Sequence, residues 1–277
     1  MTVTVSAPRS ALRPRVLRHT LRRSIRATVG WSLALGGLVV LYAATWPAFR
    51  NSREYARLFD ELPAAYRSMF TSTGAGMTTA AGFFHAELFA LTGPLLVLLA
   101  AMGAGVRAVA GEEERGRLDL LLATPVSRAR WVIEHAVALA AGVLAICATD
   151  AVVMLAAGAA VSADLTPGNV IAAWVHVGVA GIWFGILAVA VGAATGRPAL
   201  ARITVGIVAL AMYLVNGLAP MSPVLERLQP LSVFRYAIGD DPLVTGLHAG
   251  HLALVLVTAL PVLAAGAWLF RRRDLRH

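Results

Sequence analysis

Six long apolar stretches alternate with shorter polar stretches along this chain of 277 residues. Each apolar stretch is close to or above the roughly 20 residues that an α-helix needs to cross a bilayer. The pattern therefore predicts six transmembrane helices, at residues 30–48, 84–109, 131–160, 169–195, 200–219 and 248–270. Pro94 predicts a kink in the second span. In the fourth span, glycines one turn apart, at Gly181 and Gly185 and again at Gly192 and Gly196, favour a close contact with another helix.

The first 29 residues carry seven arginines and no acidic residue. Apolar residues recur there every four positions, which predicts an amphipathic helix that lies in the membrane interface with its arginines toward lipid phosphates. The arginines expected on the membrane surface are Arg15, Arg18, Arg22 and Arg26. A cleaved signal peptide is an alternative, but the basic region is too long and the first apolar run lacks a small-x-small cleavage site. The adjacent Arg22 and Arg23 leave a twin-arginine export signal as a further alternative.

The remaining chain, residues 30–277, is expected to form one transmembrane domain that includes two longer polar segments, 49–83 and 220–247. In the first of these segments, the spacing of the apolar residues predicts an amphipathic helix that ends at Pro63. In the second, the apolar residues near Val224 predict a short helix that turns back toward the membrane. Both segments are too short to hold a separate enzyme domain.

The segment 111–130, between the second and third spans, combines both signs of charge with helix signals. Leu118, Leu121 and Leu122 share one stripe of a short helix, while charged residues lie largely on its other faces. A threonine followed by proline at 124–125 is typical of the start of the next helix. The leucines need a surface on which to be buried, and a soluble partner protein would provide one. The alternative is a solvated loop that lies on the lipid headgroups.

Hydrophobic residues make up 58% of the chain and charged residues only 14%, whereas soluble domains average about 25% charged residues. This composition identifies an integral membrane protein. Cys147 is the single cysteine, so neither a disulfide within the chain nor a cysteine metal cluster can form. All 24 basic residues are arginine, so the chain lacks the lysine of a P-loop and is no conventional ATPase by itself. Metalloprotease and serine-hydrolase motifs are also missing, so no catalytic or metal site is predicted.

The arginines are distributed unequally between the two sides of the predicted bundle. Six spans place both termini on one side, and 18 of the 24 arginines fall on that side. The positive-inside rule then places both termini in the cytoplasm. Because the arginines lie beside apolar spans, orientation in the bilayer explains them better than nucleic-acid binding does. We therefore predict an all-α, multi-pass protein of the cell membrane.

Asp150 is a charged residue well inside the third predicted span. A carboxylate at that depth is costly and usually faces protein or a water-filled cavity, which would make Asp150 a polar group of a cavity. Counted from Trp131, however, it lies about 28 Å along the helix, near the outer interface, where water would hydrate it. We prefer this second interpretation.

Residues 113–128 resemble the signature of type-2 ATP-binding-cassette (ABC) exporter permeases, in which acidic residues, a glycine and leucines precede Pro-Val-Ser-Arg. Two further stretches, 231–236 and 270–275, are similar to other parts of that family. Together the resemblance covers essentially the whole chain. Arg117 and Val233 depart from the family's frequent threonine and proline, which leaves the subfamily open.

The resemblance implies that residues 112–124 form a coupling helix seated in a cleft of a separate ATPase subunit, which would bind ATP and magnesium. The residues expected to couple to that subunit are Glu112, Glu113, Glu114, Arg115, Gly116, Arg117, Leu118, Leu121, Leu122, Pro125 and Arg128. It also implies two permeases, identical or related, that work with two ATPases and have no ATPase site themselves. Few fixed charges lie in the spans, which favours a lipophilic drug, an antibiotic or a lipid-like molecule as the exported cargo.

Two other functions remain compatible with the sequence. A secondary carrier that works without ATP would be expected to show an internal repeat and paired polar residues at mid-membrane. A membrane anchor or assembly factor would not transport anything, and its 112–124 helix would dock on a different partner.

Overall fold

The computed structural model describes residues 15–50, 52, 57, 61, 79–114 and 127–273, with side chains from Ser24 onward. These residues are mostly helical and contain no strand. The helices long and apolar enough to cross a membrane are Ser24–Phe49, Ala80–Ala108, Arg128–Ala160, Pro167–Thr195, Pro198–Met221 and Ala249–Arg272. They coincide with the six predicted spans, so the all-α fold with six spans is confirmed.

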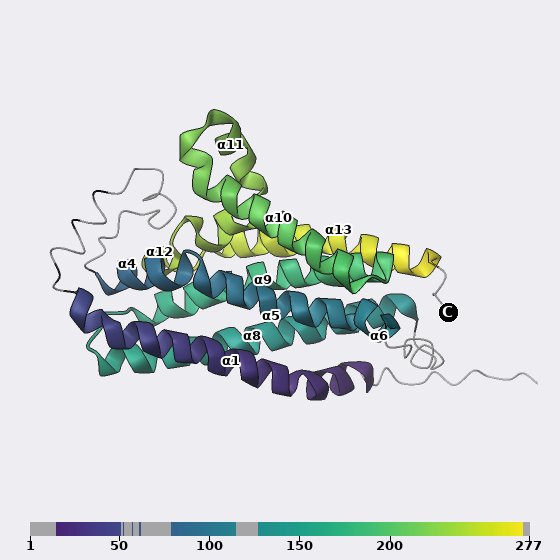
Figure 1. The fold of residues 1–277 in the computed structure, drawn as a ribbon, viewed down its shortest axis with the longest axis horizontal. Coiled ribbons are helices and arrows are strands. Elements are labelled where there is room, and N and C mark those ends of the chain that lie inside the picture. The colour runs from purple at the N-terminus through teal and green to yellow at the C-terminus, as the bar shows by residue number, and fades with distance from the viewer. Residues whose placement is uncertain are drawn as a thin grey trace, which may run out of the picture.

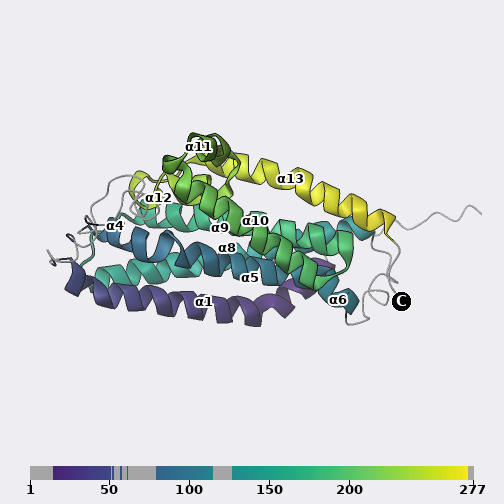
Figure 2. The same ribbon diagram turned by 45° about the horizontal axis from the view of Figure 1, so that its top comes forward.

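The long helices lie side by side in one bundle (Figure 1). Five of the spans are α1 (Arg15–Phe49), α8 (Arg128–Ala160), α9 (Pro167–Thr195), α10 (Pro198–Leu218) and α13 (Ala249–Arg272). The second span consists of α4 (Ala80–Phe84), the π-helical turn η1 (His85–Phe89) and α5 (Thr92–Ala108), and is followed by α6 (Ala110–Glu114). We call the end of the bundle that holds α6 the α6 end, and the opposite end the α4 end. The first turn of α1 and the last turn of α13 both lie at the α6 end (Figures 1 and 2).

Helix α9 is the centre of the bundle, because 78% of its spanning window is buried, against 22% for α1 and α10 and 17% for α13. Glycines allow its neighbours to come close. A Cβ atom added to Gly181 would lie 2.6 Å from Val97 of α5, and one added to Gly185 would lie 2.7 Å from a leucine methyl of α8. On the other side, a Cβ on Gly266 of α13 would lie 2.6 Å from the Cβ of Ala190. The close helix contact predicted for Gly181 and Gly185 is therefore confirmed.

The second span is interrupted one turn before Pro94. In the π-helical turn, the amide of Ala90 donates a hydrogen bond to the carbonyl of His85 at 2.7 Å, and α5 begins at Thr92. Pro94 then occupies the first turn of α5, where a missing amide hydrogen leaves no helical hydrogen bond unmade. The predicted kink is present, but it lies at residues 90–91 and not at the proline itself.

The N-terminal amphipathic stretch and the first span are one helix. α1 runs without a break from Arg15 to Phe49, about 50 Å at 1.5 Å per residue. The predicted interfacial stretch before residue 30 therefore continues directly into the first span, and its position in the membrane interface stays a prediction. A single glycine, Gly30, is tolerated inside a helix, and no proline is present there to end it. Arg26 is exposed on this helix, and the side chains of Arg15, Arg18 and Arg22 lie outside the described part.

Helix α10 crosses the bundle obliquely and carries α11 (Pro223–Leu228) away from the other helices (Figure 1). Ser222 caps α11 by accepting a hydrogen bond from the amide of Val224 at 3.3 Å. The short helix predicted near Val224 is therefore confirmed, and none of its residues is buried. The short elements around it are η2 (Ala219–Met221), η3 (Gln229–Leu231), η4 (Arg235–Gly239) and α12 (Pro242–Thr245). The helix predicted to end at Pro63 lies outside the described residues.

Candidate functional site

The candidate site begins at α6, a short helix that directly follows the second span. The amides of Glu112 and Glu113 both donate hydrogen bonds to the carbonyl of Val109, at 3.1 and 3.0 Å. Carboxylates in the first turn of a helix are favourable, because they face the positive end of the helix dipole. The turn places the three glutamates in different surroundings. Glu112 is buried, Glu113 is half-buried and Glu114 is exposed.

Glu113 forms an ion pair with Arg273, the residue that follows α13, and accepts a hydrogen bond from its guanidinium. The two side chains are only 8% and 17% exposed, so the pair is largely shielded from water. Gly196, which ends α9 with a φ of +65°, lies against this pair. A Cβ atom on Gly196 would lie 2.6 Å from the Glu113 carboxylate. Glycine suits this position because it adopts positive φ without strain and leaves room for the ion pair.

Arg128, the first residue of α8, binds the same end of α13. Its Nη1 atom donates hydrogen bonds to the carbonyl oxygens of Phe270, at 3.0 Å, and Arg273, at 2.6 Å. Its guanidinium also lies 5.4 Å from the centroid of the Phe270 ring. The last carbonyls of a helix have no partner within the helix, and a cation near them is favourable. Arg128 therefore caps the C-terminal end of α13.

We call this group of contacts the clasp, and its members are Glu113, Arg128, Gly196, Phe270 and Arg273. It joins the ends of the second, fourth and sixth spans to the start of the third span. Residues 115–126, which lie between Glu114 and Ser127 in the sequence, are outside the described residues. The described residues on either side of them, Glu113 and Arg128, both contact the C-terminal end of α13.

The start of α8 is set by Ser127, whose side chain accepts a hydrogen bond from the amide of Arg130 at 3.3 Å. Serine is one of the preferred residues at this capping position. The helix start predicted at 124–125 lies outside the described residues. The described helix begins three residues before the predicted start of the span at Trp131.

An open groove of about 370 Å³ lies beside the clasp. It is lined by Glu113, Glu114, Gly196, Arg197, Pro198, Ala199 and Leu200. Glu114 and Arg197 are exposed, and they give the groove one negative and one positive side chain next to the apolar Leu200. Surfaces that mix polar rims with apolar area are typical of contacts between proteins.

The sequence model of the family described as ABC-2 family transporter protein matches residues 15–275. The chain belongs to the ABC-2 transporter family. No curated protein is similar enough to be matched to it. The chain is therefore the membrane-spanning permease subunit of an ABC transporter, a multi-pass protein. Permeases of this family in general have no ATPase site of their own and work with an ATP-binding partner subunit.

The predicted coupling residues of this permease fall into two groups. Those outside the described residues are Arg115, Gly116, Arg117, Leu118, Leu121, Leu122 and Pro125. The described ones are Glu112, Glu113, Glu114 and Arg128. Glu113 and Arg128 contact the permease's own α13, and their predicted coupling to the ATPase stays a prediction. The sequence alone could not reveal these contacts, because Glu113 and Arg273 are separated by 160 positions.

Asp150 of α8 lies opposite the middle of the first span. Its carboxylate faces Gly36 of α1, whose Cβ position would be 3.3 Å from Oδ1. Gly36 lies between Arg26 and Arg50, about 15 and 21 Å from them along the helix, and the stretch between these arginines carries no charge. The Asp150 side chain is 0% exposed. The preferred prediction of a hydrated residue near an interface was therefore wrong.

Neither carboxylate oxygen of Asp150 has a hydrogen-bond partner among the described residues. Replacing Asp150 with leucine is expected to raise the free energy of unfolding by about 1–3 kcal/mol, because the substitution removes a buried polar group without partners. Denaturant titration in mixed micelles measures this change. Asp164→Leu is the matched control, since Asp164 is exposed, and it should change the free energy by less than about 0.5 kcal/mol. If Asp150→Leu were less stable than the wild type, the Asp150 carboxylate would have a stabilising partner, and the prediction would be wrong.

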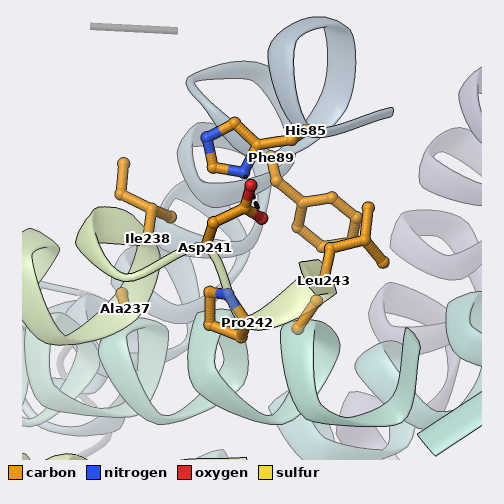
Figure 3. A pocket seen from close by; sticks show the side chains of 8 residues that line it. His85, Phe89, Ala237, Ile238, Asp241, Pro242 and Leu243 are labelled. Carbon is orange, nitrogen blue, oxygen red and sulfur yellow. Dashed lines mark ion pairs between the residues drawn. The ribbon is translucent and has the colours of Figure 1, made fainter. Parts of the chain in front are cut away.

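Histidines and aspartates meet at the α4 end, which the sequence analysis did not anticipate. Figure 3 shows the His85 ring directed at the carboxylate of Asp241, above Pro242. The two side chains approach to 2.8 Å, and both are almost fully buried. His85 comes from the π-helical turn of the second span and Asp241 immediately precedes α12, so the pair holds the 220–247 segment to the second span. In the sequence, the acidic run Asp240-Asp241-Pro242 is the only hint of this pair. It does not identify His85 as the partner, because the run has no fixed spacing to a histidine.

His176 ties α9 to the same segment. Its Nδ1 atom lies 2.7 Å from the carbonyl of Tyr236, and its Nε2 atom lies 3.2 Å from the amide nitrogen of His248. A carbonyl only accepts and an amide only donates, so the ring is neutral and carries its hydrogen on Nδ1. Within the described part of the chain, no group of three or more His, Cys, Asp or Glu side chains could hold a metal ion. We call the hydrogen bonds of His176 to Tyr236 and His248 the junction at the α4 end.

Proposed function

We propose that this permease exports a lipophilic molecule, such as a drug, an antibiotic or a lipid-like compound, out of the cell. In this proposal it works as a pair of permeases, identical or related, with two ATPase subunits that bind ATP and magnesium. It resides in the plasma membrane with both termini in the cytoplasm. Membership of the family supports the ATP-binding partner. The outward direction of transport, the cargo and the pairing of permeases are proposed in addition.

The arrangement at the α6 end is the observation that carries this proposal. The segment 115–126 resembles the coupling region of ABC exporters, and the described residues that flank it, Glu113 and Arg128, are anchored there. An open groove that includes the exposed Glu114 lies beside those contacts. An ATPase on that side would contact the segment and the groove together.

The arginine distribution supports a cytoplasmic position for the α6 end. The arginines with described side chains at that end are Arg26, Arg107, Arg128, Arg130, Arg197, Arg202, Arg271, Arg272 and Arg273, and the backbone of Arg15, Arg18, Arg22 and Arg23 in α1 lies there too. Those at the α4 end are Arg50, Arg57, Arg227 and Arg235. Short loops rich in arginine remain in the cytoplasm.

The test of the function is ATP-dependent transport in inside-out membrane vesicles. The permease is co-expressed with the ATPase encoded beside it, and accumulation of a lipophilic fluorescent dye is followed with ATP or with a non-hydrolysable analogue. An exporter accumulates the dye inside such vesicles only with hydrolysable ATP. Accumulation that is equal with the analogue, or that needs no ATPase subunit, would contradict the proposal.

Charge reversal at Glu114 tests the docking of the ATPase. Because Glu114 is exposed beside the groove, Glu114→Arg is expected to reduce co-purification of the ATPase about tenfold without affecting insertion of the permease. Glu61→Arg is the matched control, since Glu61 is also exposed but lies in the loop at the α4 end. Equal ATPase recovery with both variants would argue against docking at this groove.

A further inference from the structure

We propose that Asp150 is a proton-binding site in the seam between α1 and α8, neutral while the two helices are packed and charged only after they separate. The seam is the contact between these helices that includes Gly36 and Asp150, and α1 lies along α8 in both views of the bundle (Figures 1 and 2). Such a site would couple the position of one membrane helix to the gain and loss of a proton, whichever molecule the permease transports.

The carboxyl group of Asp150 is buried without a hydrogen-bond donor. The side chain is 0% exposed, and neither of its oxygens has a partner among the described residues. A charged carboxylate accepts hydrogen bonds and donates none, so its burial without a donor or a cation is costly in a protein interior and within a membrane. Uptake of a proton removes this cost, because it removes the charge.

The neutral acid, in contrast, can make a hydrogen bond within its own helix. A protonated carboxyl group carries one O–H donor, and carbonyl oxygens of the preceding helical turn accept hydrogen bonds from short hydroxyl side chains. The neighbouring Thr149 already donates such a bond to the carbonyl of Ala145 at 2.9 Å. The carbonyl of Ile146 is the corresponding acceptor for the O–H of Asp150. The packed helices therefore favour the neutral form over the charged form.

Gly36 of α1 provides the space that the carboxyl group occupies. A Cβ atom on Gly36 would lie 3.3 Å from Oδ1 of Asp150 and 3.7 Å from the methyl groups of Val153, so α1 packs directly against the acid. α1 is an outer helix, with only 22% of its spanning window buried, and it packs mainly on α8. A separation of these two helices would therefore expose Asp150 to water, where the charged form is stable.

The helices packed around Asp150 bring no counter-charge to it. Between residues 27 and 49, α1 carries no charge, and Tyr42 is its one titratable side chain. On α8 the nearest titratable group is Cys147, whose thiol faces Gly178 of α9. With no cation from the described residues beside it, the acid is neutralised by a proton. The titratable side chains of the other long helices that contact α8 are His176 on α9, Arg107 on α5, and His251, Arg271 and Arg272 on α13.

Infrared spectroscopy of the full-length permease in lipid bilayers tests the protonation, because a protonated carboxyl group has a C=O stretching band apart from the bands of carboxylates. At neutral pH the wild type is expected to show this band and Asp150→Asn to lack it, since asparagine keeps the size of the neutral acid without its proton. Raising the pH should remove the band from the wild type. Asp164→Asn is the matched control, because Asp164 is exposed and its replacement should leave the band unchanged.

A cross-link between the two helices tests the coupling of the proton to the seam. A Cβ atom on Gly142 of α8 would lie 3.5 Å from the Thr28 hydroxyl of α1, so Thr28→Cys combined with Gly142→Cys can form a disulfide across the seam. The native Cys147 is buried. If loss of the proton requires separation of the helices, the oxidised pair should keep the band to a higher pH than the reduced pair. The expected difference is about one pH unit for each tenfold reduction in the population of separated helices.

The proposal is overturned if the wild type shows no band that Asp150→Asn removes, or if the oxidised and reduced cysteine pairs lose the band at the same pH. It is also overturned if the cysteine pair does not cross-link, since α1 would then not pack on α8 as described. If the asparagine variant fails to fold, Asp150→Leu, which is expected to be more stable than the wild type, takes its place. Neither measurement uses ATP or the ATPase subunit, so failure here is distinguishable from failure of the proposed function.

Discussion

Replacing Gly105 with leucine is expected to prevent the permease from accumulating in a folded form. Gly105 of α5 packs against α9, and an added Cβ atom would collide with the carbonyl oxygen of Gly185 and lie 2.8 Å from the Cβ of Ala188. Both are parts of α9, the most buried of the described spanning helices. Overpacking of this kind costs about 3 kcal/mol or more, and Gly105→Ala should show a smaller loss in the same direction.

Gly37→Leu is the control for this experiment. Gly37 of α1 is exposed, and an added Cβ atom would meet nothing within 4 Å. The variant should fold at least as well as the wild type, because glycine inside a helix costs about 1 kcal/mol relative to good helix formers. Size-exclusion profiles of the detergent-extracted proteins compare the two variants. A monodisperse Gly105→Leu protein at wild-type yield would show that α5 and α9 do not pack as described.

His176→Ala is expected to lower the free energy of unfolding by about 2–4 kcal/mol. The substitution removes both hydrogen bonds that join α9 to Tyr236 and His248 and leaves a cavity beside the central helix. Glutamine carries both a donor and an acceptor on its amide, so His176→Gln should lose less. Denaturant titration in mixed micelles gives the difference between these two variants.

The matched control for His176 is His251→Ala at the same end of the bundle. The His251 side chain is 30% exposed and lies 3.2 Å from Asp240, which is itself 42% exposed. Exposed pairs contribute little, so this variant should lose less than about 1 kcal/mol. Equal losses at His176 and His251 would show that the junction at the α4 end contributes little to stability.

The clasp changes the interpretation of the segment that carries the family resemblance. From the sequence, Glu113, Glu114 and Arg128 were all expected to couple to a partner ATPase. In the structure, Glu113 and Arg128 are engaged by α13, and Glu114 is the glutamate exposed beside the groove. A charge reversal at Glu113 therefore tests a contact within the permease, while the same change at Glu114 tests the contact with the ATPase.

Asp150 shows where sequence reasoning about membrane depth fails. Helix α8 has 33 residues, more than the roughly 20 that a bilayer requires, so a position counted along it does not give a depth. The position of Asp150 across the membrane is inferred from the residue that it faces. That residue, Gly36, lies in the middle of the uncharged part of α1. The amphipathic stretch before residue 30 and the first span form one continuous helix, because a helix that starts on an amphipathic stretch can continue into an apolar one.

The sequence by itself determined the class of this protein, its six spans, the interruption near Pro94 and the family to which it belongs. These properties depend on local patterns, because a backbone in lipid must satisfy its hydrogen bonds within each helix. The tertiary structure decided which charges are paired, which helix is central and how deep Asp150 lies. Such contacts join residues far apart in the chain, as Glu113 and Arg273 are, and hydrophobic periodicity contains no information about which distant side chain will be the neighbour.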